Sequence, residues 1–424
     1  MTSSRQKKLD NLIGEKYPRE FPARETIKSV LWQYEGNKFA KERITPNLDP
    51  SKPVYNVAGR ILARRNMGKN IFFDLMDQTG TIQLHADMTL TYGVRSGSRL
   101  LADLIHECDL GDCVGIEGTM TANPRGEPLL LICNWTLLAK ALKEPGDKFH
   151  GVKDHEMKYR HRELDLLSSA DSRAVFHKRA EIVFEIRKYL NDRDFIEIET
   201  PILQPIYGGA TAKPFITKHK SLGQDFYLQI SSELYLKRAM VGGFDRVYSF
   251  SRCFRNEGIS PEHNPEFTNL EIFESCATHE TVRKLVHELI THISSKFSTQ
   301  SFTQNVVSDL PSDEWPLSRK WPKNESIAEA WELYAQSENG DMEIASGATD
   351  LNDPREQESR LRKVYFSEED ENFNPFDPNY IEALEYGALP WAGVGIGIDR
   401  LCMLLLNRSN IREVILFPTL KNQS

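Results

Sequence analysis

The sequence lacks the features that mark membrane, secreted and disulfide-bonded proteins. No apolar run approaches the roughly 20 residues that a membrane-spanning helix needs. The N-terminal residues are charged and have no apolar core of the kind that a signal peptide carries. The 6 cysteines are scattered without a C-x-x-C pair, which argues against a zinc site or a disulfide framework. We therefore expect a cytoplasmic, soluble protein that makes no membrane contact.

An excess of positive charge is also missing, because the formal net charge is −8 at pH 7. A protein that binds nucleic acid by bulk charge would be basic, so any such contact here must use local patches. Hydrophobic residues make up 40% of the chain, which is enough for globular cores. The length of 424 residues predicts two or three domains.

A β-rich pattern begins at Val54, after a charged and proline-punctuated N-terminal segment in which residues 7–17 could form a helix. An amphipathic stretch at residues 99–107 follows the third expected strand. The expected strands are residues 54–65, 70–77, 81–88, 113–119 and 129–138. Five short strands with a helix between the third and fourth predict an OB-fold barrel.

The clearest boundary in the chain is the Pro/Gly-containing segment at residues 145–151. Residues 171–190 after it have apolar side chains mostly at helical spacing and predict a long helix. We therefore divide the chain into an N-terminal helical extension (1–52), the barrel (53–142), a linker (143–170) and a second large domain (171–424).

Residues 247–250 and 267–273 both alternate between polar and apolar side chains, which predicts two strands. The loop between them is long for a hairpin. Its charged residues are Arg252, Arg255, Glu257, Glu262, His263 and Glu266. Composition alone favours a solvated connector over a functional loop.

The exact sequence of this loop instead favours a functional role. Phe254-Arg255-Asn256-Glu257 and, further on, His263-Asn264-Pro265-Glu266-Phe267-Thr268 resemble motif 2 of class II aminoacyl-tRNA synthetases, in the form of the lysyl-tRNA synthetases. Residues 195–201 look like motif 1, and residues 393–401, with glycines at alternate positions, look like motif 3. The resemblance covers nearly everything from residue 54 to residue 418, with a weak and short region near 301–340. It implies an α+β fold: an OB-fold β-barrel plus an antiparallel sheet flanked by helices. It also implies a homodimer that pairs through motif 1.

The resemblance implies ATP and Mg²⁺ as cofactors. Arg255 would bridge the α-phosphate and the amino-acid carboxylate, and Arg400 would hold the γ-phosphate; these two arginines are the expected catalytic residues. Phe267 would stack on adenine, with Glu257 and His263 positioning the nucleotide. Glu343 would bind ATP through Mg²⁺, and Glu332 would be the second metal ligand. Taken singly, each of the charged residues could instead form a surface salt bridge.

The resemblance also places the amino-acid pocket. The expected lining residues are Gly209, Glu233, Glu271, Phe273, Ser346, Ala348 and Asp350. Glu271 would take the α-ammonium and Glu233 the side-chain ammonium of the substrate. Without that context, paired glycines more often make a tight turn and a Glu at a helix start is more often a cap.

Four of these positions depart from the lysyl pattern. Ser346 stands where an Asn is usual, Ala348 where an aromatic is usual, Asp350 where a Glu is usual, and Phe273 where a Tyr is usual. The pocket volume should therefore differ by more than a methylene. Two acids in the pocket still favour a cationic substrate, so lysine is the first choice and a lysine analogue the alternative.

The barrel resembles the anticodon-binding domain of bacterial lysyl-tRNA synthetases. By this resemblance Phe72 would stack on an anticodon base, Gln83 would hydrogen-bond one, and Arg64 or Arg65 would hold the backbone. Adjacent strand residues point to opposite sides, so at least one of Phe72 and Phe73 belongs to the core. The first hypothesis is therefore an enzyme that activates lysine with ATP and transfers it to lysine tRNA. The alternatives are a paralogue with another amino acid or a non-tRNA acceptor, and a catalytically silent RNA-binding protein.

Overall fold

The computed structural model describes residues 4–11, 16–22, 24–35, 52–87, 101–123, 125–144, 154–298, 302–337, 340–366 and 376–421. The chain divides into two compact units, Met1–Lys153 and Asp154–Ser424. The expected linker, residues 143–170, crosses this division, and its Pro/Gly segment lies outside the described residues.

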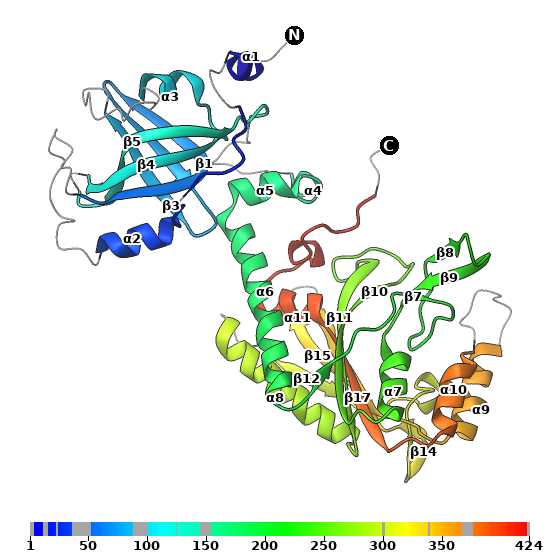
Figure 1. The fold of residues 1–424 in the computed structure, drawn as a ribbon. Coiled ribbons are helices and arrows are strands. Elements are labelled where there is room, and N and C mark those ends of the chain that lie inside the picture. The colour runs from blue at the N-terminus through cyan, green and yellow to red at the C-terminus, as the bar shows by residue number, and fades with distance from the viewer. Residues whose placement is uncertain are drawn as a thin grey trace. The chain divides into compact units, whose positions relative to one another are not determined.

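The first unit contains a closed five-stranded barrel in the order β1-β2-β3-β5-β4, which confirms the expected OB fold (Figure 1). The strands are β1 (Val54–Met67), β2 (Asn70–Met76), β3 (Thr81–Asp87), β4 (Cys113–Ala122) and β5 (Pro128–Ala139). Helix α3 (Leu101–Glu107) lies between β3 and β4 in the chain. Residues 88, 99 and 100 of the expected elements lie outside the described residues.

Two short helices precede the barrel. Helix α1 (Ser4–Asp10) begins and ends earlier than the expected helix at residues 7–17, of which 12–15 lie outside the described residues. Helix α2 (Ile27–Glu35) buries Ile27, Val30 and Tyr34 in the barrel core. At least this part of the N-terminal extension therefore folds with the barrel.

The second unit is built on a seven-stranded sheet in the order β12-β15-β16-β17-β11-β10-β6. Its strands are β6 (Ile196–Glu197), β10 (Arg246–Phe254), β11 (Glu266–Ser275), β12 (Gln304–Val307), β15 (Ala330–Ser337), β16 (Gly340–Thr349) and β17 (Trp391–Gly397). All neighbours are antiparallel except β6 and β10. The two alternating stretches beside the charged loop are β10 and β11, as expected.

One face of this sheet is covered by helices. Apolar residues of α6 (Ala170–Asn191), α8 (His279–Phe297) and α11 (Ile398–Leu405) form a single core with residues of the central strands (Figure 1). Helix α6 begins at the cap residue Ser169, whose hydroxyl accepts a hydrogen bond from the Ser172 N–H. The central strands are thus covered on this face, and the two cavities described below lie over the opposite face.

The opposite face carries smaller elements. They are α7 (Glu233–Val241), α9 (Pro354–Phe366), α10 (Pro378–Glu385), the sheet of β7 (Leu203–Gln204), β9 (Gln224–Leu228) and β8 (Ile216–His219), the 3₁₀ turn η2 (Ser312–Glu314), and the pair β13 (Lys320–Trp321) and β14 (Asn324–Ala328). None of the described helices combines the length and apolarity needed to cross a bilayer.

An arginine connects the first and last segments of the second unit through hydrogen bonds. Arg162 lies on α5 (Arg162–Ser168), which follows α4 (His155–Arg160). Its guanidinium donates to the carbonyls of Leu416 (2.9 Å), Arg412 (2.6 Å) and Ile415 (3.2 Å), just at and beyond η3 (Ile411–Glu413). A fourth bond of 3.0 Å reaches Asp165. The C-terminal segment is therefore held by side-chain bonds.

Candidate active site

Strand β11 determines the order in which four of the site residues follow one another. Phe267, Asn269, Glu271 and Phe273 alternate along it and share one face. Leu270 and Ile272, of the opposite parity, are buried in the core under the helices. A strand advances about 3.4 Å per residue, so these four side chains are spaced about 7 Å apart along the ligand face.

Strand pairing extends two of these positions into rows across the sheet. Glu271 pairs with Gly395, which pairs with Ser346, which pairs with Glu332. Phe273 pairs in the same way with Gly393, Ala348 and Ala330. Residues paired across strands point to the same side, so the first row is polar and the second is a ring followed by three small residues.

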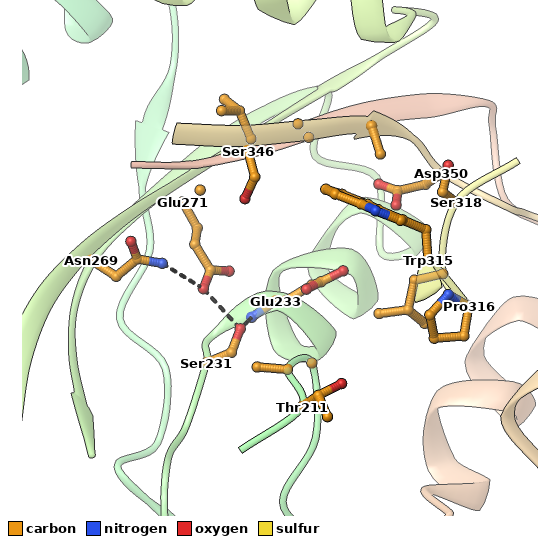
Figure 2. A pocket seen from close by; sticks show the side chains of 18 of the residues that line it. Thr211, Ser231, Glu233, Asn269, Glu271, Trp315, Pro316, Ser318, Ser346 and Asp350 are labelled. Carbon is orange, nitrogen blue, oxygen red and sulfur yellow. Dashed lines mark hydrogen bonds between the residues drawn. The ribbon is translucent and has the colours of Figure 1, made fainter. Parts of the chain in front are cut away.

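Two cavities lie over this face. The first, about 380 Å³, is lined by the expected amino-acid residues, and Figure 2 shows part of its wall. The second, about 300 Å³, is lined by the expected nucleotide residues. Their linings share Arg255, Asn269, Ser346 and Gly395. The site is therefore bipartite, with an arginine where its two halves meet.

Glu271 anchors one end of the first cavity. Its Oε1 accepts hydrogen bonds from Ser231 Oγ (2.8 Å), the Ser232 N–H (3.3 Å) and Asn269 Nδ2 (3.2 Å), two of which are drawn in Figure 2. Its Oε2 is buried and has no hydrogen-bond partner among the residues that the structure describes. Burial, and next the charge of Glu233, raise the pKa of Glu271 to about 7. A cation that reached Oε2 would satisfy the free oxygen and favour the ionised form.

At the other end of the cavity, two lining acids pair with a lysine that sequence analysis did not select. Lys237 is fully buried on α7, and its Nζ lies 2.5 Å from Glu233 Oε1 and 2.8 Å from Asp350 Oδ1. Burial alone would lower the pKa of Lys237, but Asp350 and Glu233 raise it above its ordinary value. Burial raises the pKa of Asp350 to about 7 against the opposing effect of Lys237. Asp350 lines the cavity as expected, yet it is already paired with a protein cation.

Glycines shape both ends of the cavity. Gly209 has a φ of +82°, and a Cβ there would lie 3.0 Å from Glu233 Cβ and from Ser231 Oγ. At Gly393 a Cβ would lie 2.1 Å from Cε1 of Phe273. The Phe273 ring therefore lies directly against the strand backbone, with Lys237 Nζ 5.6 Å from its centroid.

Arg400 lines the second cavity and contacts two of its other lining residues. Its guanidinium donates to the carbonyl of Glu343 (3.0 Å) and to His263 Nε2 (2.7 Å). Burial, and next the charge of Arg400, lower the pKa of His263. A neutral ring that accepts at Nε2 carries its proton on Nδ1, where it donates to Ser260 Oγ at 2.7 Å. The motif 2 loop is thus bound to Arg400 of α11 through an uncharged histidine.

The remaining nucleotide residues also gather here. The Arg255 guanidinium lies 5.1 Å from the Phe267 ring centroid, and Glu257 lines the same cavity. Glu343 Oε2 is 3.5 Å from an Arg400 nitrogen. The structure therefore brings together Arg255, Glu257, His263, Phe267, Glu343 and Arg400.

The two expected metal ligands lie on neighbouring strands on either side of Tyr334. The Tyr334 hydroxyl donates to Glu332 Oε2 at 2.9 Å, and Tyr334 pairs with Glu343 across the strands. The hydrogen bond to Glu332, together with burial and the two carboxylates, raises the pKa of Tyr334 to about 12. Within the described residues, no group of three or more His, Cys, Asp or Glu could hold a metal by itself. Two carboxylates still fit Mg²⁺, which usually takes one or two of them plus substrate phosphates.

The barrel brings two of its three expected anticodon residues together. Phe72 stacks on His85, with centroids 4.7 Å apart and planes at 9°. Gln83 is two residues from His85 on β3 and so shares its face. Arg65 pairs with Phe72, whereas Arg64 pairs with the core residue Phe73 and donates to the Ile105 carbonyl at 2.7 Å. Of the two arginines considered, only Arg65 shares the Phe72 face.

Several site residues were missed from the sequence. Asn269 could have been found, because it alternates with Phe267 and Glu271 on a predicted strand. Lys237 could have been suspected from its i, i+4 spacing to Glu233 on a helix. The sequence holds no comparable signal for Trp315, which lines the first cavity from a loop in the weakly matching region.

Comparison with known proteins agrees with this geometry. The family model for tRNA synthetases class II (D, K and N) matches residues 154–306 and 297–421, and the model for an OB-fold nucleic acid binding domain matches residues 55–141. The chain is 34% identical over 455 residues to the lysine–tRNA ligase of Dehalococcoides mccartyi, which covers 88% of this chain and 89% of the relative. It is 36% identical over 445 residues to the lysine–tRNA ligase of Coxiella burnetii, covering 87% of each. The chain therefore belongs to the class II tRNA synthetases, in the family of lysyl-tRNA synthetases.

Proposed function

We propose that this chain is a lysine–tRNA ligase. In the first step a carboxylate oxygen of lysine attacks the α-phosphorus of ATP, and pyrophosphate leaves with the electrons of the broken P–O bond. In the second step a hydroxyl of the terminal tRNA ribose attacks the lysyl carbonyl carbon, and AMP leaves. Neither step requires a covalent enzyme intermediate, so positioning and electrostatics carry the reaction.

The observation that carries this proposal is the match between the charges of the first cavity and those of lysine. Glu271 offers one negative charge at one end. At the other end Lys237 offsets one of the two charges of Glu233 and Asp350, which leaves one. Arg255 offers one positive charge at the junction. Lysine presents the complement: an α-ammonium, a side-chain ammonium and a carboxylate.

The junction suits the first step. Arg255 reaches both cavities, so it can contact a carboxylate in one and an α-phosphate in the other, reducing their repulsion. A preorganised cation aimed at charge that develops in the transition state is commonly worth about 10²–10³ in rate. Arg400, held by His263, would contact the terminal phosphates, and Phe267 would stack on adenine.

Glu332 and Glu343 would hold Mg²⁺ together with phosphate oxygens. When bound, the ion would neutralise phosphate charge. Glu343 lines the second cavity and Glu332 the first. Ser346 and Gly395 line both cavities, and their small size leaves room for the ligand.

The barrel, residues 53–142, would bind the tRNA anticodon. The half-buried Phe72 ring, stacked on the buried His85, would be the stacking platform, and Gln83 would hydrogen-bond a base on the same face. Arg65, now paired with Asp74 at 2.8 Å, would supply charge for the backbone. The catalytic part would be residues 171–424. An enzyme with this acceptor works where translation occurs, so we place it in the cytoplasm.

We further propose a homodimer. Ile196 on β6, in the segment that resembles motif 1, is 51% exposed, and Phe184 on the preceding helix α6 is 65% exposed. Large apolar side chains in that position are what a subunit interface would cover.

Amino-acid-dependent ATP–pyrophosphate exchange across the standard amino acids and lysine analogues tests the proposal, followed by charging of lysine tRNA. Exchange with lysine and charging of its tRNA would support the ligase. Exchange with another amino acid, or lysine exchange without charging, would instead indicate the paralogue. An Arg255→Ala variant should lose exchange while retaining its fold.

A further inference from the structure

We infer that Trp315 closes the side-chain end of the amino-acid cavity and sets the longest side chain that the enzyme accepts. This inference rests on the proposed function and deepens it by naming a residue that determines specificity.

The first support is where the ring lies. Trp315 lines the first cavity and packs with Leu310 on a patch of three buried alanines, Ala328, Ala330 and Ala348. Two of these alanines end the row that begins at Phe273 and Gly393. The small side chains on β15 and β16 thus leave the space that the indole occupies.

The second support is the distance from Glu271. Ala348 lies two strands and two residues away from Glu271 in the sheet. With about 4.8 Å between strands and about 3.4 Å per residue, this separation is roughly 12 Å. In the view of Figure 2, Glu233 lies between Glu271 and Trp315. A substrate with its α-ammonium at Glu271 would therefore place its side-chain ammonium near Glu233, with the indole beyond it as the end wall.

The third support is that the loop carrying the ring is fixed. The Leu351 N–H donates to the Leu317 carbonyl (2.9 Å), and Gln357 Nε2 donates to the Pro316 carbonyl (3.0 Å). Ser318 forms a β-bridge with Asp350, the partner of Lys237. The end wall is thus tied to Asp350, the residue directly after β16 that pairs with the buried lysine, and is held in place by these bonds.

A series of substrates that differ only in length tests this role. Ornithine, lysine and homolysine carry the same two ammonium groups and differ by single methylenes. Removing the indole should allow homolysine, the longest of the three, to bind. One methylene in such a pocket typically changes kcat/KM about 10- to 200-fold. Trp315→Ala should therefore raise the homolysine-to-lysine ratio of kcat/KM at least about 10-fold, mainly through KM, with Trp315→Phe intermediate.

Trp321→Ala is the matched control, because Trp321 packs against His279 and is not part of the cavity lining. In this variant the homolysine-to-lysine ratio of kcat/KM should equal that of the wild type. Thermal stabilisation by each of the three amino acids, without ATP, gives a second readout that needs no turnover. If Trp315→Ala does not fold, Trp315→Phe and Trp315→Leu provide the graded series.

An unchanged homolysine-to-lysine ratio in folded Trp315 variants would overturn the inference while leaving the ligase intact. Wild-type protein that is stabilised by lysine but shows no lysine-dependent exchange would overturn the ligase and leave the length series valid as a binding test. Absence of any stabilisation by the three amino acids would overturn both.

Discussion

Lys237 Nζ and Asp350 Oδ1 lie 2.8 Å apart, so a buried cation of the protein itself neutralises part of an acidic substrate pocket. Glu233 shares the same ammonium. This arrangement leaves one net negative charge for the substrate side chain, where counting the two acids alone would leave two. Replacing the side-chain ammonium of the substrate by a neutral group should therefore weaken substrate binding.

Lys237→Met should destabilise the second unit strongly. Removing one partner of a buried ion pair typically costs about 3–5 kcal/mol, because the remaining charge is left buried. Urea unfolding at pH 8 measures this loss. Lys284→Met, which removes a 79% exposed lysine from an i, i+4 pair with Glu288, should change stability by less than about 0.5 kcal/mol. A double variant with Asp350→Asn should recover part of the loss, and strict additivity would contradict the pairing.

Lysine binding should weaken as the pH falls below about 7. The pKa of Glu271 is raised to about 7 in the ligand-free protein, so at pH 6 the carboxyl is mostly protonated and must release a proton to bind an α-ammonium. At pH 8.5 it is already ionised and no release is needed. Calorimetry in two buffers of different ionisation enthalpy counts these protons. Binding with no proton release at pH 6 would show that Glu271 does not take the ammonium.

Gly393→Ala should reduce stability and Gly395→Ala should reduce activity, although the two positions lie only two residues apart on β17. A Cβ at 393 would collide with the Phe273 ring, and such overpacking typically costs about 1–3 kcal/mol of stability. A Cβ at 395 meets nothing closer than 3.5 Å but points into the junction of the two cavities. Thermal melts and pyrophosphate exchange should therefore show a stability loss for the first variant and an activity loss for the second. Restored stability in Gly393→Ala with Phe273→Leu would identify the collision as the cause.

Arg162→Met should loosen the C-terminal segment. The substitution leaves three carbonyls and the buried Asp165 without their guanidinium partner. Hydrogen exchange of residues 411–417 should accelerate more than exchange elsewhere in the second unit. Arg355→Met is a suitable control because that side chain is 90% exposed and pairs only at the surface with Asp353. Equal exchange in both variants would refute the role of Arg162.

Phe72→Ala should raise the KM for tRNA and leave lysine-dependent pyrophosphate exchange unchanged. Base–aromatic stacking is worth about 1–3 kcal/mol per base, so the expected change is about 5- to 150-fold. Gln83→Ala should act in the same direction by a smaller factor. Loss of exchange in Phe72→Ala, which the barrel position does not predict, would show that the variant is misfolded or that the assignment is wrong.

The motif residues could be predicted from the sequence because each lies on a short local pattern. Alternation identified β10 and β11, and the order of residues along β11 already fixes the order of the site. The barrel was equally accessible from its strand spacing. Glu332 and Glu343 were expected as metal ligands by resemblance and remain a prediction; the sequence did not indicate their common neighbour Tyr334.

Contacts between distant segments could not be predicted in the same way. Lys237 and Asp350 are 113 residues apart, and nothing local in either segment indicates that they pair. The choice between Arg64 and Arg65 depends on a register shift between Ile61 and Ala63 in β1. One irregular residue reverses which side chains face outward for the rest of a strand, and simple alternation does not reveal it.

The alternation of β11 has a consequence for how this enzyme can change. Its odd-numbered site positions, from Phe267 to Phe273, face the ligand, and Leu270 and Ile272 between them hold the helices. A point substitution can alter the chemistry or the core separately. A one-residue insertion or deletion within the strand would exchange the two faces at every position beyond it. Side chains that line the cavities would then enter the core, and apolar core side chains would enter the cavities. This strand can therefore diverge by replacement but not by change of length.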